Sequence, residues 1–123
     1  MCARVEPFVH RMADAMLAAD LVICRAGATT LAELAAIGRA AVLIPLGIAT
    51  DDHQRHNAEI LERASAAKIL DESLLSGASL VDVIIVLIRD PARFRQMGKK
   101  MGSFAVPNAA EIIVDRIFSL ANE

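Results

Sequence analysis

The sequence predicts an α/β fold in which about three parallel strands form a three-layer sheet with about six helices. Short runs rich in β-branched residues alternate with longer segments of helical periodicity, an order typical of parallel sheets. The 123 residues are 55% hydrophobic but include only four Phe and no Trp or Tyr. We therefore expect one domain whose core is built from aliphatic side chains.

The first helix and the first strand are predicted between residues 8 and 24. Apolar residues recur at helical spacing in FVHRMADAMLA, which predicts a helix over 8–18. The continuous apolar run LVIC, residues 21–24, is typical of a strand buried on both faces. The residues expected on the apolar face of the helix are Phe8, Met12, Ala15 and Met16.

A helix over about 29–37 and a strand over 40–45 are predicted next. Thr29 or Thr30 is positioned to cap this helix, because hydroxyl side chains accept hydrogen bonds from the first free amides. Gly38 is positioned to end it, since glycine readily adopts the left-handed conformation found at helix C-termini.

The middle of the chain continues this alternation. Residues 46–52 are predicted to form a loop, and Asp51 or Asp52 can cap the helix HQRHNAEILERAS, residues 53–65. The short run AAKIL, residues 66–70, predicts the third strand.

The last part of the chain is predicted to be helical. The segment 79–90 has the β-branched content of a strand, but its length and a capping Ser79 favour a helix. Pro91 suits the first turn of a further helix, and Asn108 can cap a final amphipathic helix. The apolar residues at helical spacing in the segment 79–90 are Leu80, Val83, Ile84 and Leu87.

Charge and cysteine content narrow the class of protein. Thirteen basic and 15 acidic residues are mixed along the chain, so we expect no nucleic-acid partner. Cys2 and Cys24 are isolated thiols without metal-ligand spacing, which favours a reducing, cytoplasmic setting. The longest apolar run, residues 83–88, is far shorter than the roughly 20 residues that span a bilayer.

The segment RAGATT, which follows the first strand, is the first candidate site. In an open parallel sheet, ligands bind beyond the carboxyl ends of the strands. Gly27 allows close approach of the backbone, and the free amides of the next helix attract a phosphate. The hydroxyls of Thr29 and Thr30 can add hydrogen bonds, and Glu33 can bind a ribose. The alternative is structural, with a capping threonine and Glu33 completing a capping box.

The segment DDHQRHNAE, which follows the second strand, is the other candidate site. Gln54 and Asn57 are three residues apart on one helical face, and their side-chain amides can donate hydrogen bonds to sugar hydroxyls and accept hydrogen bonds from them. A capped, solvated helix start is the alternative. A metal site is a third interpretation, although no second cluster completes its ligands, which would be Asp51, Asp52, His53 and His56.

Arg25 ends the first strand beside the proposed crevice. Its guanidinium can neutralise phosphate, or it can pair with a carboxylate and brace the loop, and the sequence leaves both open.

Over essentially its whole length, the sequence resembles the nucleotide-sugar-binding part of MurG-type glycosyltransferases. The resemblance rests on two stretches in the expected order, FVHRMADAMLAADLVICRAGATTLAELAAIGRAAVLIP and DDHQRHNAEILERASAAKIL. It implies a partial Rossmann-like sheet from the C-terminal domain of a two-domain GT-B enzyme. The implied donor is UDP-GlcNAc, with no obligatory metal or other cofactor.

The resemblance also implies roles for individual residues. The backbone of Val9 occupies the position that contacts uracil, and Glu33 occupies that of the ribose-binding acid. Ala28, Thr29 and Thr30 match the helix start near the phosphates. His53 and Gln54 match the paired amides that contact the donor, although His53 stands where Gln is frequent. Asn57 belongs to the same DHQ-x-x-NA motif.

Two features of such enzymes have no counterpart in the sequence. Nothing matches the Gly-Gly-Ser phosphate loop of the first βα unit, and the acceptor domain with its catalytic base is absent. We therefore expect residues 1–123 to be a donor-binding fragment without turnover of its own. In the complete enzyme, the resemblance implies a lipid-linked acceptor and a location at the inner face of the plasma membrane.

Two other interpretations stay open. The chain could be the donor subunit of a split lipid-directed glycosyltransferase, although such subunits usually carry the glycine-rich loop. It could also be a non-catalytic association module that binds no uridine nucleotide.

Overall fold

Three parallel strands form the centre of the fold, which confirms the predicted α/β class. The structure is a computed structural model that describes residues 2–47 and 52–122. The strands β1 (Leu21–Cys24), β2 (Ala40–Leu43) and β3 (Lys68–Ile69) lie in the order β1-β2-β3. Leu21 lies opposite Ala40, which sets the register of the first pair.

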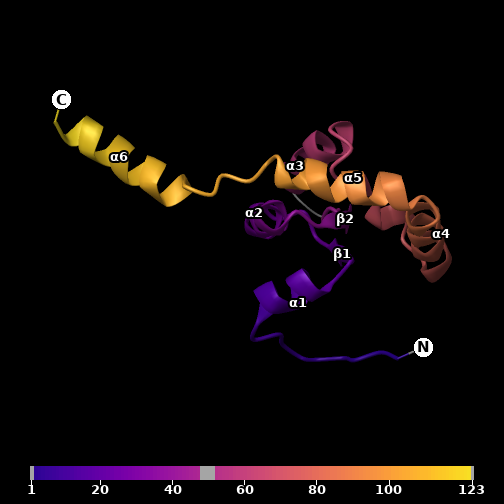
Figure 1. The fold of residues 1–123 in the computed structure, drawn as a ribbon. Helices are drawn as coiled ribbons and strands as arrows, with labels where there is room; N and C mark the ends of the chain where they lie inside the picture. The colour runs from indigo at the N-terminus through magenta and orange to yellow at the C-terminus, as the bar shows by residue number, and fades with distance from the viewer. Residues whose placement is uncertain (1, 48–51, 123) are drawn as a thin grey trace.

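Six α-helices accompany the sheet in the described part of the chain (Figure 1). They are α1 (Met12–Ala18), α2 (Ala28–Ile37), α3 (His53–Arg63), α4 (Gly77–Ile88), α5 (Pro91–Gly102) and α6 (Ala109–Ala121), and a 3-10 helix, η1, spans Glu72–Leu74.

The core lies on both faces of β2, whose four residues are all buried. Successive side chains of a strand point to opposite faces, so Ala41 and Leu43 pack with α1, α2 and α3. Ala40, Val42 and Ile44 pack on the other face with α4 and α5. The helices contribute Met16, Leu34 and Leu61 to the first cluster, and Leu87 and Met97 to the second.

Three glycines let α5 pack closely against the turn between α2 and β2. Gly38 ends α2 in the left-handed conformation, with φ of 63°, as predicted. A Cβ atom added at Gly98 would lie 2.8 Å from the carbonyl oxygen of Gly38, and one at Gly102 would lie 3.6 Å from its Cα. The close packing holds the start of the second strand against α5.

The first helix is shorter than predicted. It begins at Met12 rather than at residue 8, and an ion pair between Arg11 and Asp14 spans its first turn. Of the four residues expected on its apolar face, only Met16 is buried, and Phe8 is 68% exposed. The residues before Met12 have no core to pack against, and packing provides most of the stability of a short helix.

The prediction that residues 21–24 are buried on both faces is also wrong. β1 lies at the edge of the sheet, and Ile23 is 40% exposed. The other two predicted strands are longer than the observed ones, because only Lys68 and Ile69 are paired with β2 in the register of the sheet. Ala66 and Ala67 are nevertheless buried in the core.

Two predicted helix caps are wrong. The N-cap of α2 is Gly27, and neither Thr29 nor Thr30 lies in the cap position, because both are already inside the helix. Helix α4 begins earlier than expected, with Ser76 as its N-cap and Ser79 as the third residue of a reciprocal capping box.

Several other local predictions are confirmed. The segment 79–90 is helical as far as Ile88, and Leu80, Val83 and the buried Leu87 of its expected apolar face pack on the sheet. Pro91 is the first residue of α5. Asp52 and Asn108 occupy the N-cap positions of α3 and α6, although neither side chain makes a capping hydrogen bond. Asp51 lies outside the described residues.

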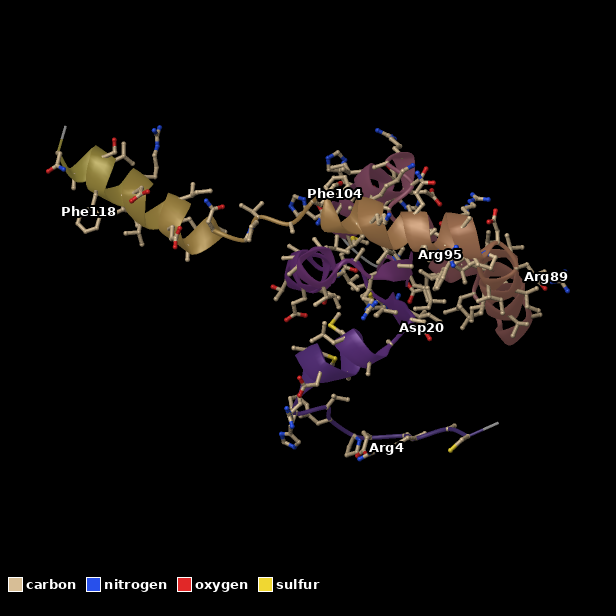
Figure 2. The ribbon with its side chains drawn as sticks, viewed as in Figure 1. Arg4, Asp20, Arg89, Arg95, Phe104 and Phe118 are labelled. Carbon is tan, nitrogen blue, oxygen red and sulfur yellow. The ribbon has the colours of Figure 1, made fainter. Side chains whose placement is uncertain are left out.

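Helix α6 extends away from the sheet and its helices (Figure 1). Its apolar residues have helical spacing as predicted, but none of its described residues is buried. Ile113 and Ile117 are each 59% exposed, and Phe118, labelled in Figure 2, is 64% exposed. Among the described residues, no helix is long and apolar enough to cross a membrane.

Candidate functional site

The loops that follow the three strands lie at one edge of the sheet, because the strands are parallel. Residues 25–27 connect β1 to α2, residues 44–52 connect β2 to α3, and residues 70–76 follow β3. Backbone hydrogen bonds continue the pairing beyond the strands, from the amide of Ile44 to Cys24 and from that of Leu70 to Leu43. The two predicted site segments are therefore neighbours.

The N-terminus of α2 presents free backbone amides at this edge. Gly27 is its N-cap, and no side chain caps the helix. The first amides of a helix have no partner inside it, so those of Ala28, Thr29 and Thr30 are available to a ligand. Gly27 has a φ of −67°, which any residue adopts, and no atom lies within 4 Å of the position of an added Cβ. The absence of a side chain at Gly27 thus leaves open space before the helix.

Thr29, Thr30 and Glu33 lie in the first turns of α2. Thr29 and Glu33 are exposed and Thr30 is half-buried. Glu33 follows Thr29 by four residues, so the two side chains share a flank of the helix. The alternative prediction, a capping threonine with Glu33 completing a capping box, is wrong, because no side chain caps this helix.

The polar residues of α3 divide between two places. The side-chain oxygen of Gln54 accepts a hydrogen bond of 3.0 Å from the backbone amide of Leu46, which orders the loop after β2. Asn57 lines a groove between α2 and α3 that also includes Ala28 and has a volume of about 250 Å³. His53 is the exposed first residue of α3.

The structure thus brings Ala28 and Asn57 together. Thr29, Thr30 and Glu33 are not among the residues that line this groove.

Val9 lies in the extended segment before α1, so the prediction of a helix over 8–18 is wrong at this residue. No hydrogen bond joins its backbone to another residue of the described chain. The backbone amide and carbonyl of Val9 are therefore available to a ligand.

A carboxylate that sequence reasoning missed joins the three loops. Glu72 pairs with Arg25 at 2.5 Å and accepts a hydrogen bond of 2.7 Å from the amide of Gly47. Arg25 also donates to the carbonyl oxygen of Ile44, at 3.3 Å. Arg25 therefore braces the loop, which is the second of its two predicted roles. The Gly47 hydrogen bond and then the Arg25 hydrogen bond lower the pKa of Glu72 below its usual value.

A second charged pair lies beside this network. Arg55 of α3 pairs with Asp71, whose carboxylate also accepts hydrogen bonds from the amide and the hydroxyl of Ser73. The Ser73 hydrogen bonds, with a smaller contribution from Arg55, lower the pKa of Asp71. Asp71, Glu72 and Gly47 line a cavity of about 430 Å³ at this edge of the sheet.

The sequence gives only a weak indication of the Asp71 and Glu72 ion pairs. The DES triplet at 71–73 is a turn-forming pattern, but its ionic partners lie 16 and 47 positions away. The proposed metal ligands include Asp51, which the structure does not describe. Among the described residues, no three His, Cys, Asp or Glu side chains gather in a group that could hold a metal ion.

The chain is similar to known proteins over most of its length. Residues 3–113 match the family described as glycosyltransferase family 28 C-terminal domain. A protein of Geotalea uraniireducens is 45% identical over 115 residues, and one of Pelobacter propionicus is 48% identical over 120 residues. Both are named UDP-N-acetylglucosamine–N-acetylmuramyl-(pentapeptide) pyrophosphoryl-undecaprenol N-acetylglucosamine transferase.

The matches cover most of this chain but only part of its relatives. They include 94% and 98% of the chain, and 32% of each relative. The crystal structure of Acinetobacter baumannii MurG superposes with a TM-score of 0.86 at 42% identity, and the match covers 94% of this chain and 33% of that one. The chain thus spans about a third of the length of these relatives.

Proposed function

Because the chain belongs to the family of glycosyltransferase family 28 C-terminal domains, we propose that it binds the donor UDP-GlcNAc. In this proposal, residues 1–123 are the C-terminal part of a GT-B nucleotide-sugar-binding domain. We propose that the whole protein converts lipid I to lipid II in peptidoglycan synthesis. The relatives are named as N-acetylglucosamine transferases, which supports this proposal.

The uncapped N-terminus of α2 is the observation that carries the proposal. Its amides have no capping side chain, and the space before Gly27 is open. Helix α2 has ten residues, so the partial positive charge at its start is well developed. A diphosphate is the ligand that such a terminus favours, and the position beyond the carboxyl ends of parallel strands is where nucleotides bind.

The other site residues are assigned around this phosphate position. Glu33 binds the hydroxyls of the ribose, and the backbone of Val9 contacts the uracil. His53, Gln54 and Asn57 contact the sugar or its phosphates, with Gln54 also ordering the loop after β2. These assignments are supported by exposure, since Glu33 and His53 are both exposed at this edge of the sheet.

The proposed reaction inverts the configuration of the donor sugar. The C4 hydroxyl of a lipid-linked muramyl sugar attacks C1 of N-acetylglucosamine, and the bond from C1 to the phosphate oxygen breaks. UDP leaves with the electron pair, and a base outside this chain takes the hydroxyl proton. The helix terminus stabilises the charge that develops on the diphosphate, and preorganised dipoles of this kind contribute strongly to catalysis.

The proposal implies that the 123-residue chain alone has no turnover, because the acceptor site and its base belong to other parts of the enzyme. In this proposal, those parts bind the lipid-linked acceptor at the inner face of the plasma membrane. The alternatives are a split transferase with another acceptor and a non-catalytic association module. An assay in which the chain releases UDP in the presence of lipid acceptor would contradict the expected inactivity.

Titration of the chain with UDP tests the donor assignment. We expect Glu33→Ala to weaken binding by about 1–3 kcal/mol, because the ribose hydroxyls lose their acceptor. Glu111→Ala is the matched control, since Glu111 is also exposed but lies on α6. Equal affinities of the parent and Glu33→Ala would remove Glu33 from the site, and no UDP binding by the parent would favour an association module.

A further inference from the structure

A second cavity lies on the side of the sheet where β3 begins, opposite the edge that holds the proposed donor site. Its volume is about 220 Å³, and it lies between the end of α3, the start of β3, the end of α4 and one face of α5. Its polar lining residues are Glu62, Ser65, Lys68, Arg93, Gln96 and Lys100.

Helix α5 provides most of the hydrogen-bond donors of this cavity. Arg93, Gln96 and Lys100 are separated by three and four residues, so helical geometry places them on one face of α5. Asp90 caps this helix by accepting a hydrogen bond from the backbone amide of Arg93, and this contact does not use the guanidinium. The cavity therefore has a row of donors along one wall.

The charges of the cavity are not balanced. Lys68 pairs with Glu62 at 3.2 Å, and Glu62 also accepts a hydrogen bond of 3.0 Å from the amide of Ile69. Among the residues that the structure describes, no ion pair joins Arg93 or Lys100 to a carboxylate. Two positive charges consequently remain without partners at the cavity.

The deep side of the cavity is apolar. Leu87 and Met97 line it, and they are only 4% and 5% exposed. Cationic groups beside an apolar surface suit an anion that carries a hydrocarbon group. Arginine binds a phosphate through two parallel hydrogen bonds, and lysine adds a point charge.

We propose that this cavity, between α3, β3, α4 and α5, is a binding site for a phosphomonoester, with the phosphate held by Arg93 and Lys100 and the carbon group against Leu87 and Met97. The site is independent of the donor site, because none of the residues assigned to the donor lines this cavity.

The 123-residue chain titrated with phenyl phosphate tests this proposal. We expect saturable binding that Arg93→Gln and Lys100→Gln each weaken about tenfold or more, the effect typical of removing a charged hydrogen-bond partner. Arg95→Gln and Lys99→Gln are matched controls, because both residues lie on α5 but line a different cavity, and both should leave the affinity unchanged. Figure 2 labels Arg95 on this helix. Far-ultraviolet circular dichroism checks that each variant is folded.

Further arms identify the source of the phosphate. Inorganic phosphate should bind more weakly than phenyl phosphate, because it makes no contact with Leu87 or Met97. Cosedimentation with phosphatidic acid vesicles that is lost in Arg93→Gln but kept in Arg95→Gln, without a response to phenyl phosphate, would assign the phosphate to a lipid. Absence of binding in both arms, equal losses in the control variants, or competition by UDP would overturn the proposal.

Discussion

Gly98 provides a direct test of how α5 is held against the sheet. In Gly98→Ala, the new Cβ atom would lie 2.8 Å from the carbonyl oxygen of Gly38 and 3.6 Å from the amide nitrogen of Ala40. The optimum separation of non-bonded heavy atoms is about 3.5–4.0 Å. Both nearby atoms belong to the backbone, so no change of rotamer can relieve the first contact, and α5 must move away from β2.

Two opposing effects set the size of the change. Alanine is better than glycine inside a helix by about 1 kcal/mol. Overpacking of a close contact costs about 1–3 kcal/mol, and a rigid backbone contact places Gly98→Ala towards the upper end. We therefore expect a net loss of about 1–2 kcal/mol in the free energy of unfolding, and a fall in the melting temperature of about 3–10 °C.

Thermal and urea denaturation followed by circular dichroism measure this change. Gly102→Ala is the matched control on the same helix, because its Cβ would lie 3.6 Å from the Cα of Gly38, an ordinary contact. We expect it to be as stable as the parent, or more stable by up to about 1 kcal/mol. A Gly98→Ala protein at least as stable as the parent would refute the packing argument.

Three further predictions concern the edge of the sheet that holds the proposed donor site. The pKa of Glu72 is lowered in the folded chain, so its ionised carboxylate stabilises the fold above the normal carboxyl pKa, and this stabilisation is lost as the pH falls through the lowered pKa. Glu72→Gln should therefore lose less stability than the parent between pH 5 and pH 3, measured by urea denaturation at each pH. Burial raises the pKa of Cys24, whereas Cys2 is exposed. Iodoacetamide at pH 8 should therefore label Cys2 much faster than Cys24 in a mass-spectrometric time course. Equal labelling rates would contradict the burial of Cys24. Gly27→Val should lower the melting temperature by only about 2–6 °C, since its φ is ordinary and its surroundings are open but valine is a poorer N-cap than glycine. It should weaken UDP binding about tenfold or more by filling the space beside the start of α2. Unchanged affinity would show that the diphosphate lies elsewhere.

The sequence correctly predicted the structural features that depend on residues close together in the chain. Gly38 ends α2 and Pro91 starts α5, because the backbone preferences of these residues act within one turn. The apolar spacing of residues 79–90 correctly favoured a helix over a strand. The order of helices and strands follows from the same alternation of periodicities, and the two site segments were placed at one edge of the sheet because parallel strands require it.

Local signals failed where burial depends on the rest of the fold. LVIC has the composition of a central strand, but β1 is at the edge of the described sheet, and Ile23 is partly exposed. The residues from Phe8 to Arg11 have a helical pattern and no packing partner, so the helix starts only at Met12. A pattern states which face of a segment is apolar, but only the tertiary structure states whether something covers that face.

The sequence by itself determined the α/β class, the family and the end of α2 at Gly38, since these depend on short-range periodicity, contiguous motifs and a local backbone preference. Only the tertiary structure brought Glu72 to Arg25 and Gly47, and Asp71 to Arg55. These charged partners are 16 to 47 positions apart, and neither spacing nor composition encodes which of many carboxylates will meet a given arginine. Their pairing is decided by the parallel sheet, which places the ends of its strands within the reach of one side chain.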